Sequence, residues 1–295
     1  MRVLVTGASG FLGRYVLEEL AHNGIEAVAV GRRRPAHGAL SAFIEADLLS
    51  CADYSTLLRE AAASHLIHLA WYAEHGKYWT SPFNLRWVDA TTRLIEAFCA
   101  WGGRQVVVAG TCAEYDRDQG WCIEDRASLS PETLYGASKE AARRLAMAVC
   151  AQHQVSCAWG RVFIPFGTGE DPRRVIPSLI AVFRGTLPAF GVNASACRDF
   201  LHVSDVARGL LALLLNNADG TYNVSSGEPR QMGLVVRELA RQLHADPQRV
   251  LELATARPGE PRMLAGDNSK LTSLGWTASL DLERGIELTL RETPT

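Results

Sequence analysis

The hydrophobic residues of this chain fall into two alternating patterns. Short apolar runs, each of a length that suits one buried strand, occur at residues 3–5, 26–30, 43–46, 65–69, 105–109, 155–161 and 221–224. Elsewhere the apolar residues recur every three to four positions, as in residues 11–20, 82–101 and 134–153, which is the period of an amphipathic helix. Strands that alternate with helices predict a parallel sheet with helices on both faces. The first half of the chain is therefore expected to form an α/β fold.

The alternation becomes irregular after residue 161. Prolines and glycines that favour turns are frequent between residues 165 and 172. Further helices are expected at about residues 173–184, 204–215 and 232–243, and from residue 282 onward. Ser204 or Asp205 is expected to cap the second of these helices. These segments predict a smaller C-terminal α/β unit beside the main sheet.

Three glycines lie between the first apolar run and the first helix, in the sequence TGASGFLG. Gly7 permits a tight turn, Gly10 lets a pyrophosphate approach the backbone, and Gly13 lets the helix pack closely on the strand. The amides and the dipole at the start of a helix also favour a diphosphate. We therefore predict a Rossmann-type, doubly wound sheet with a dinucleotide at this turn. A purely structural strand–turn–helix joint is the alternative.

Composition and charge exclude several classes of protein. A net charge of −2 over 295 residues argues against a general nucleic-acid-binding protein. The sequence has no run of roughly 18 apolar residues, so no membrane-spanning helix is expected. It opens on a strand and not on a signal segment. The seven cysteines are scattered without a CxxC pair, so we expect reduced thiols, no metal site and a cytoplasmic location.

The second apolar run ends in Gly31, followed by Arg32, Arg33 and Arg34. NAD sites of this fold usually carry an acidic residue here, which binds the ribose 2′-hydroxyl. A 2′-phosphate would instead contact guanidinium groups, and one charge-assisted hydrogen bond is worth roughly 1.5–3 kcal/mol. We therefore predict that NADP(H) is preferred, with Gly31, Arg32 and Arg33 at the 2′-phosphate and NAD(H) as the alternative. A solvated basic loop would show no such preference.

Tyr135 and Lys139 stand four positions apart near the start of the helix expected over residues 134–153, so they share one helix face. A free phenol has a pKa of about 10. An ammonium about 4 Å away is worth roughly 4 kcal/mol at an effective dielectric constant near 20. That interaction would bring the phenol pKa toward neutrality, where acid–base catalysis works best. Together with the glycine turn and Thr111 at a strand end, the pair predicts a catalytic site.

Taken together, these motifs resemble those of the extended short-chain dehydrogenase/reductases that act on nucleotide sugars. The resemblance covers nearly the whole chain. It rests on TGASGFLG (6–13), GTCAEY (110–115), YGASK (135–139), RVFIPFG (161–167), RDFLHVSDVA (198–207), YNVSSG (222–227), RPGEP (257–261) and NSKLTSLGW (268–276). It implies a dinucleotide-binding domain at residues 1–161 plus about 203–223, and a substrate-binding domain at 162–202 and 224–295.

The resemblance also implies roles for individual residues. Tyr135 would be the general acid/base, and Thr111 would hold the reacting sugar oxygen. Lys139 would bind the nicotinamide ribose and lower the pKa of the tyrosine. Asp47 and Leu48 would contact the adenine.

Further residues complete the two implied sites. The remaining dinucleotide contacts would be Ser9, Phe11 and Leu12 on the glycine turn, and Leu69 and Ala70 after the fourth strand. The substrate, a nucleotide-diphosphate sugar, would contact Tyr72 in the aromatic loop WYAEHGKYWT (71–80), or this loop would pack only on its own aromatic rings. Arg198 and Arg257 would hold the diphosphate, with surface ion pairs as the alternative for each.

Departures from the family pattern narrow the chemistry. The dehydratases of the family carry Thr-Asp-Glu where this chain has Thr111, Cys112 and Ala113, so elimination of water lacks its acid and base. The epimerase-reductases of the fucose type place a cysteine two residues after the Ser/Thr. Cys112 follows one residue after it, which on a strand end is the opposite face. Cys112 is therefore not expected to be catalytic.

Two reactions fit the remaining residues. One is reduction of a 4-keto-6-deoxy-sugar nucleotide by NADPH in deoxysugar biosynthesis, as in CDP-abequose synthase, with hydride transfer to C4 and Tyr135 as the general acid. The other is 4-epimerisation through a transient ketone with tightly held NAD. The three arginines favour reduction, which is our prediction from the sequence. A redox-sensing binding protein is a third interpretation, but such sensors typically lose the Tyr/Lys pair.

The resemblance and the length of two helices also predict the assembly. Residues 82–101 and 134–153 would pair with their symmetry mates, so that four helices form the interface of a homodimer. Two-fold pairing is the commonest way in which a soluble oligomer closes.

Overall fold

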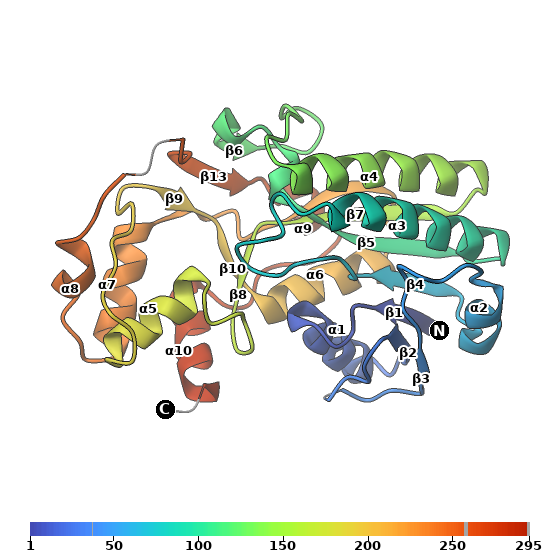
Figure 1. Cartoon of the computed structure of the whole chain (residues 1–295), viewed down its shortest axis with the longest axis horizontal. Helices are drawn as coiled ribbons and strands as arrows, with labels where there is room; N and C mark the ends of the chain where they lie inside the picture. Colours follow the sequence, from blue (N-terminus) through green and yellow to red (C-terminus); the bar gives the residue numbers. More distant parts are fainter. Residues whose placement is uncertain (37, 257–258, 294–295) are drawn as a thin grey trace.

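The computed structural model describes residues 1–36, 38–256 and 259–293 (Figure 1). Seven parallel strands form the central sheet, in the order β11-β7-β5-β4-β1-β2-β3. The strands are β1 (Arg2–Thr6), β2 (Glu26–Gly31), β3 (Ala42–Glu45), β4 (His65–His68), β5 (Gln105–Thr111), β7 (Ser156–Val162) and β11 (Gly220–Val224). Each apolar run of the sequence corresponds to one of these strands, which confirms the doubly wound parallel sheet.

The strand order reverses between β1 and β4, because the chain runs outward through β2 and β3 and then returns to the other side of β1. Ligands of open α/β sheets bind outside the carboxyl ends of the strands at such a reversal. The topology therefore places a binding site beyond the ends of β1, β4 and β5.

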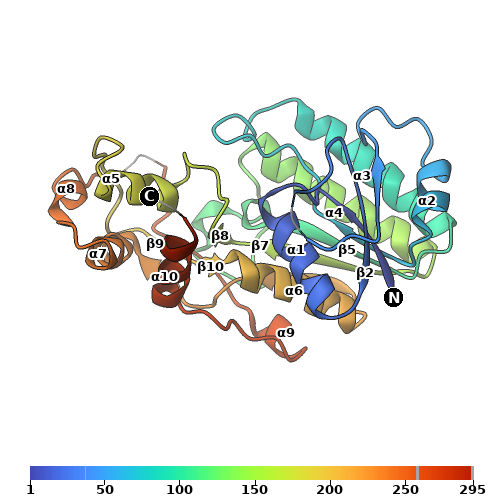
Figure 2. The same cartoon turned by 90° about the horizontal axis from the view of Figure 1, so that it is seen from below.

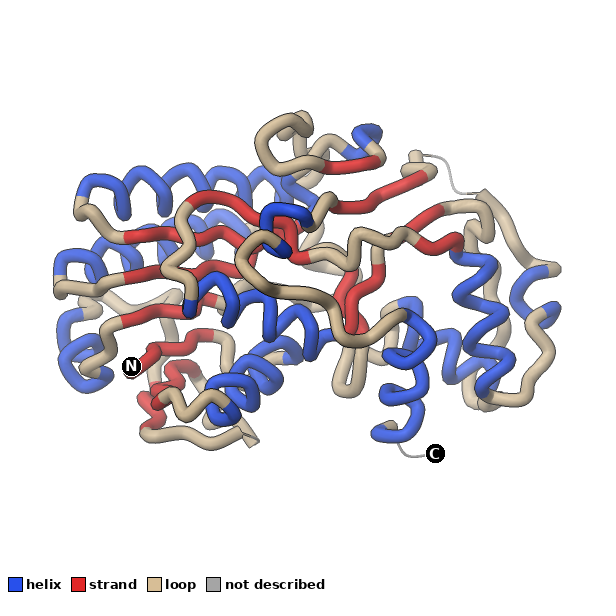
Figure 3. Tube along the Cα trace, turned by 180° about the vertical axis from the view of Figure 1, so that it is seen from behind, coloured by secondary structure: helices blue, strands red, loops and turns tan. Residues whose placement is uncertain are grey.

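Alternate residues of each strand face opposite sides of the sheet, so each side has its own core. On one side Val3 and Val5 pack with α1 (Phe11–His22) and α6 (Val203–Leu215). On the other side Leu4 packs with α2 (Ser55–Ala61), α3 (Phe83–Ala100) and α4 (Leu134–Gln152). The tube in Figure 3 shows the resulting layers, with helices on both sides of the strands.

The remaining elements form a smaller part beside the sheet (Figures 1 and 2). Its third core includes Leu179, Val235 and Ile286, which come from three different helices. The helices of this part are α5 (Val175–Phe183), α7 (Met232–Gln242), α8 (Gln248–Leu251) and α10 (Leu282–Glu292). The short helix α9 (Ser269–Thr272) instead packs on the core of the sheet through Leu271. Its strands are β6 (Trp121–Cys122), β8 (Ile164–Phe166), β9 (Cys197–Arg198), β10 (Phe200–His202), β12 (Arg230–Gln231) and β13 (Met263–Gly266). Two 3-10 turns, η1 (Cys112–Glu114) and η2 (Arg117–Gln119), follow β5.

Two buried aspartates fasten the loops of this smaller part. Asp199 accepts hydrogen bonds from the backbone amides of Ser226, at 2.7 Å, and Gly266, at 3.1 Å. Asp205 accepts from the amides of Ser279 and Leu280. Both side chains are fully buried, so each of these amides would lose its acceptor if the carboxylate were removed.

The cap predicted for the helix over residues 204–215 was wrong. Helix α6 begins at Val203, and its cap is His202, whose Nδ1 accepts from the amide of Ser204 at 3.4 Å. Asp205 lies in the first turn of the helix and not before it, because its carboxylate faces the interior and binds the loop at Ser279.

Helix α2 was not predicted, since its seven residues are too few for a clear apolar period. Within the part of the chain that the structure describes, no helix combines the length and the apolar character needed to cross a membrane.

Candidate active site

The turn between β1 and α1 makes close approaches that require glycine. Gly7 has a φ of +69°, and a Cβ there would lie 2.7 Å from the nitrogen of Ala70. A Cβ on Gly13 would lie 2.3 Å from the carbonyl oxygen of Gly7. Helix α1 begins after Gly10 and has no acidic residue in its first turn. Its first amides and the positive end of its dipole are therefore suited to a diphosphate.

A hollow of about 170 Å³ lies beside this turn and receives walls from both parts of the molecule. It is lined by Ala8, Ser9, Gly10, Phe11, Arg14, Pro35, Ala36, Thr168 and Gly169. Arg14 joins two of these walls, because its Nη2 donates to the carbonyl oxygen of Thr168 at 2.7 Å. The glycine turn, the adjoining hollow and the guanidinium together fit the phosphate-bearing part of a dinucleotide.

Of the other predicted dinucleotide contacts, Leu69 and Ala70 lie directly beside Gly7. The amides of Leu69 and Ala70 donate to the hydroxyl of Thr6 at 3.2 and 3.1 Å, which fixes the end of β4 against the end of β1. Leu12, on α1, packs against the core on its side of the sheet, and Leu48 is buried in the core on the other side. Asp47 is exposed, and its Oδ1 accepts from the amide of Leu49 at 3.1 Å.

The basic segment after β2 stays at the surface. Arg32, Arg33 and Arg34 are exposed, whereas Gly31 is half-buried at the strand end. A Cβ on Gly31 would meet nothing within 4 Å. None of the ion pairs formed by the described residues involves these three arginines. Their guanidinium groups therefore remain available to an anion.

Thr111 and Tyr135 meet at the carboxyl edge of the sheet, where Thr111 ends β5 and Tyr135 lies in the first turn of α4. The Thr111 hydroxyl accepts from the amide of Ala113 at 3.3 Å and hydrogen-bonds with the Tyr135 phenol. A Cβ on Gly136 would lie 2.2 Å from the carbonyl oxygen of Ala113, so α4 begins in close contact with η1. The structure thus brings together the two hydroxyl groups that the sequence predicted to share a site.

Lys139 lies one turn further along α4 and is buried. Its Nζ donates to the carbonyl oxygen of Ala109 at 2.9 Å and lies 4.0 Å from the ring centre of Trp71. Burial lowers the pKa of Lys139 to about 7, although the carboxylate of Glu114 acts in the opposite direction. The lysine is therefore close to titrating at physiological pH.

The predicted effect of Lys139 on the pKa of Tyr135 was wrong for this arrangement of side chains. Burial raises the pKa of Tyr135, and the hydrogen bond with Thr111 opposes this increase. Lys139 is not among the main groups that shift the pKa of the phenol, and its Nζ instead contacts the carbonyl oxygen of Ala109 and the ring of Trp71. Tyr135 is consequently a protonated hydrogen-bond donor at neutral pH in this structure.

The aromatic loop 71–80 packs against Tyr135. The amide of Tyr135 donates to the carbonyl oxygen of Trp79 at 3.1 Å, and the ring of Tyr78 meets the Tyr135 ring edge-on at 4.8 Å. Tyr72, which is predicted to bind substrate, donates its hydroxyl to Glu74 at 2.9 Å and packs on Phe83. The contact between this loop and the tyrosine was not foreseen, since only their order along the chain is visible in the sequence.

Two predicted substrate residues lie in the smaller part. Arg198 forms an ion pair with Glu260 at 2.7 Å and donates to the carbonyl oxygen of Pro261 at 2.9 Å. Its guanidinium is thus already engaged in an ion pair, which was the alternative, but the Arg198 side chain is only 11% exposed, so the pair does not lie at the surface as that alternative stated. Arg257 lies outside the described residues.

The residues that follow Thr111 offer no acid–base pair. Burial raises the pKa of the Cys112 thiol to about 12, so the thiol is neutral near pH 7. Ala113 has no ionisable group, and the Glu114 side chain is fully buried. Within the described residues, no group of His, Cys, Asp and Glu side chains could hold a metal ion.

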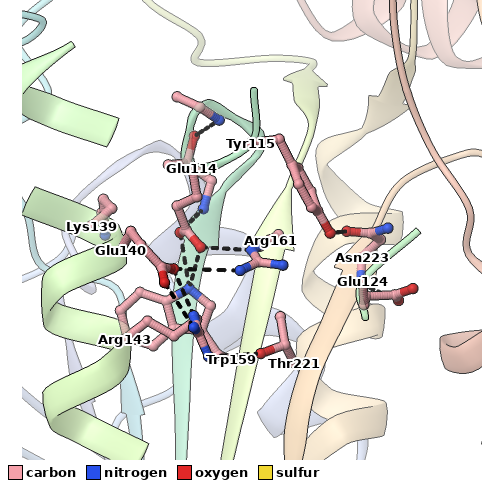
Figure 4. Close-up of polar contacts among 12 residues, drawn as sticks. Glu114, Tyr115, Glu124, Lys139, Glu140, Arg143, Trp159, Arg161, Thr221 and Asn223 are labelled. Carbon is pink, nitrogen blue, oxygen red and sulfur yellow. Dashed lines mark hydrogen bonds and ion pairs between the residues drawn. The ribbon is translucent and has the colours of Figure 1, made fainter. Parts of the chain in front are cut away.

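Three further residues behind Thr111 were missed from the sequence. Glu114 accepts hydrogen bonds from Trp159 Nε1 at 2.9 Å and Arg161 Nε at 2.7 Å, all in the interior (Figure 4). One signal was available, because Arg161 falls in an otherwise apolar run that becomes a central strand. A charge in such a strand requires a buried partner.

A doubly wound sheet with a glycine turn at its reversal point and a Thr–Tyr–Lys set at its edge defines a dinucleotide-dependent enzyme. The model of the NAD dependent epimerase/dehydratase family matches residues 3–225, and the chain belongs to this family. The resemblance seen in the sequence is thereby confirmed, and with it the assignment as an enzyme that acts on nucleotide sugars.

Three similar proteins cover nearly the whole chain. The chain is 29% identical to a UDP-glucose 4-epimerase of Azospirillum brasilense, over 97% of this chain and 89% of that protein. MoeE5, whose structure was solved in complex with UDP-glucuronic acid and NAD, is 34% identical to this chain in sequence. The two structures have a TM-score of 0.85, and the match covers 99% of this chain and 100% of that chain. The UDP-glucose 4-epimerase of Thermus thermophilus in complex with NAD is 26% identical, with a TM-score of 0.82 and coverage of 99% and 98%.

Proposed function

We propose that the protein is a nucleotide-sugar 4-epimerase that acts through a transient 4-keto sugar with a nicotinamide cofactor. The observation that carries this proposal is the chemistry around Thr111. A hydroxyl and a phenol lie together there, while the next two residues, Cys112 and Ala113, offer neither an acid nor a base for elimination of water. Such a set of groups suits exchange of one hydroxyl proton and no further proton transfer.

Each residue of the site then has one task. The bound nicotinamide dinucleotide supplies the acceptor and donor of the hydride. For oxidation Tyr135 must first be deprotonated, so that its phenolate can take the proton of the sugar 4-hydroxyl, and during reduction the resulting phenol returns this proton to the same oxygen. Thr111 already accepts from the Ala113 amide, so its own hydrogen can be donated to the reacting oxygen. Lys139 carries a positive charge toward the ribose.

The substrate class is inferred from the similar proteins. MoeE5 was solved with UDP-glucuronic acid and with UDP-glucose, and several related proteins are UDP-glucose 4-epimerases. We therefore propose a UDP-hexose or UDP-hexuronic acid as substrate, held between the sheet edge and the segments 162–202 and 224–295. The solved structures of MoeE5 and of the Thermus enzyme also contain NAD, which makes NAD the cofactor of this proposal.

Reduction of a 4-keto-6-deoxy-sugar nucleotide by NADPH is the second candidate. The exposed Arg32, Arg33 and Arg34, with half-buried Gly31 before them, favour it, because they offer cations to a 2′-phosphate and no carboxylate to a ribose hydroxyl. This was the function preferred from the sequence. The epimerase is now favoured, because relatives along the full chain are epimerases.

One experiment separates the two candidates. The purified protein is denatured, and the released dinucleotide is identified by mass spectrometry. The native protein is then incubated with UDP-glucose, UDP-glucuronic acid and a 4-keto-6-deoxy-sugar nucleotide. An epimerase yields a mixture of two 4-epimers without net consumption of reduced cofactor. Stoichiometric loss of NADPH with the keto sugar, and no epimer from the other two, would overturn the epimerase proposal.

We also propose the homodimer expected from the sequence. Helices α3 and α4 pack side by side on one face of the sheet, and Leu85 and Leu145 lie exposed on them, at 58% and 44% of their full surface. Paired helices with exposed leucines suit a symmetric contact. Light scattering at micromolar concentration should give about twice the chain mass, and a monomer would contradict the proposal.

A further inference from the structure

A buried group of charged and aromatic side chains, the Glu114 network, lies directly behind the candidate active site (Figure 4). We define it as Glu114 on η1, Trp159 and Arg161 on β7, and Glu140 on α4. Arg161 reaches both acids, with Nε at 2.7 Å from Glu114 and Nη2 at 3.5 Å from Glu140. The exposed fraction of Glu114 is 0% and that of Arg161 is 1%, so this is an ion pair of the interior.

The backbone is shaped to hold this network. Gly110 interrupts the apolar β5 strand, and a Cβ there would lie 2.1 Å from Trp159 Nε1 and 2.7 Å from Glu114 Oε1. Buried ion pairs often add little net stability over apolar side chains of the same volume. Stability alone therefore does not explain why a carboxylate occupies this place.

Glu114 holds the backbone of Thr111. Its Oε1 accepts from the Thr111 amide at 2.8 Å, while the Thr111 hydroxyl accepts from the amide of Ala113. These two bonds form a reciprocal cap around η1, which fixes the end of β5. The orientation of the Thr111 hydroxyl at the reacting oxygen thus depends on the Glu114 carboxylate.

Glu114 is also the counter-charge of Lys139. Trp159 lies between the two groups, since its Nε1 donates to Glu114 and its ring centre is 5.9 Å from Lys139 Nζ. His68 on β4 also faces this ammonium. Burial, and to a smaller extent the charge of Lys139, lowers the pKa of His68 to about 3, so the imidazole is neutral near pH 7. Tyr135 on α4 is a neutral phenol, and Glu140 is engaged by Arg143 and Arg144.

We propose that Glu114 is a positioning residue for the reaction, which holds the Thr111 backbone and supplies the negative charge that keeps the buried Lys139 ammonium protonated. The catalytic part of this inference rests on the proposed roles of Thr111, Tyr135 and Lys139. Even with Glu114 in place, burial leaves the pKa of Lys139 at about 7. Loss of the carboxylate would therefore leave the lysine largely neutral at pH 7.

The first test reads the lysine directly and needs no turnover. The 295 residues include only the lysines Lys77, Lys139 and Lys270, so a protein labelled with ¹³C at lysine Cε gives three resolvable signals. Lys139→Met assigns the signal of Lys139. In the full chain, with and without added NAD, Glu114→Gln should lower the titration midpoint of Lys139 by about one pH unit.

Glu124→Gln is the matched control. Glu124 is a second buried glutamate near the network, and its Oε1 accepts from the amide of Asn223 at 2.7 Å (Figure 4). It is not among the groups that act on Lys139, so the midpoint should stay as in the wild type. An unchanged midpoint in folded Glu114→Gln would overturn the proposal.

The second test separates the charge of Glu114 from its hold on Thr111. Glu114→Gln should lower kcat about tenfold or more, with the KM for the nucleotide sugar within about twofold. Glu114→Asp keeps the charge but is one methylene shorter, so it should restore the lysine midpoint and leave kcat reduced. If the wild type turns over no nucleotide sugar, the proposed function fails, while the titration still decides whether Glu114 sets the state of Lys139.

Two further measurements test the inference even if Glu114→Gln does not fold. Glu114→Gln combined with Arg161→Met removes both charges of the buried pair and leaves no unpaired guanidinium, and it should show the same lower midpoint. The wild type alone also tests the inference. A Lys139 that is already neutral at pH 6 would have no effective counter-charge, and this result would overturn the proposal.

Discussion

The two parts of the molecule hold their binding surfaces by different means. In the sheet part the backbone forms most of the binding surface, through parallel strands, a glycine turn and the free amides of α1. In the smaller part, side chains fasten the loops, as Asp199 does to the amide of Ser226 and Asp205 to that of Leu280. These partners lie 27 and 75 residues apart along the chain. Substitutions should therefore damage the two parts in different ways.

The sheet part should be most sensitive at its glycines. Gly13→Ala places a Cβ 2.3 Å from the carbonyl oxygen of Gly7, so α1 must shift away from the turn. We expect affinity for the dinucleotide to fall about a hundredfold or more, measured by calorimetry. Gly24→Asn is the control, because Gly24 has a positive φ that Asn tolerates and nothing lies within 4 Å of its Cβ position. Equal loss in both variants would contradict this explanation.

Tyr135→Phe should separate binding from chemistry at the boundary between the parts. It removes the phenol proton but keeps the ring that packs on Tyr78. Turnover should fall by about 10²–10⁴, with dinucleotide affinity unchanged. Thr111→Val should have a smaller effect, and Cys112→Ala should be nearly silent because the thiol is neutral. Loss of activity in Cys112→Ala but not in Tyr135→Phe would replace this mechanism by a thiol-based one.

Asp199→Ala should damage the smaller part by leaving buried donors without an acceptor. The amides of Ser226 and Gly266 and the Ser226 hydroxyl all lose their partner. The free energy of unfolding should fall by about 3 kcal/mol, measured with denaturant. Asp281→Ala, which removes an exposed helix cap on α10, should cost only about 1 kcal/mol. Similar losses for both would show that the loops do not depend on the buried carboxylate.

Lys139→Met should stabilise the dinucleotide-free protein while it abolishes turnover. The folded pKa of about 7 lies below the ordinary 10.5, so burial of the charge destabilises the fold at pH 7 and below. We expect a gain of about 2 kcal/mol or more at pH 6, which shrinks as the pH rises from 7 toward 10. Between about pH 7 and 10, Lys139 of the unfolded chain still holds a proton that Lys139 of the folded protein has lost. The absence of any gain in stability at pH 6 would contradict this prediction.

The smallest effect is expected at the surface of the sheet part. Arg32→Ala with Arg33→Ala removes two exposed cations that contact no acid among the described residues. Affinity for NADP(H) should fall about tenfold, and affinity for NAD(H) should stay constant. Equal affinities for the two dinucleotides in the wild type would show that these arginines belong to a solvated surface loop and do not bind the 2′-phosphate.

The same contrast explains what the sequence could predict. The glycine turn and the seven strands were predicted because periodicity and spacing determine them locally. The neighbourhood of Tyr135 was predicted only in part. Its contact with Thr111 follows from strand and helix ends at one sheet edge, whereas the packing of Tyr78 on its ring depends on how a loop folds.

The groups that were missed are side chains with distant partners. Glu114 meets Arg161 across 47 positions, and Arg198 is engaged by Glu260 across 62. Neither partner can be read from a local pattern, so Arg198 was expected to be free for a diphosphate. The position of the Lys139 ammonium has the same origin, because its contacts are the distant residues Trp71 and Ala109.

The hollow beside the glycine turn has one wall from the smaller part, at Thr168 and Gly169. Whatever occupies it therefore shares a boundary with the part proposed to hold the sugar. If a bound sugar nucleotide raises the affinity of the protein for the dinucleotide by some factor, the bound dinucleotide must raise the affinity for the sugar nucleotide by the same factor. An enzyme that reuses one dinucleotide through many cycles would gain from this reciprocity, since each arriving substrate would slow the escape of the cofactor. The hydrogen bond from Arg14 to Thr168 connects α1 with the smaller part, so it is a contact through which the two affinities could be coupled.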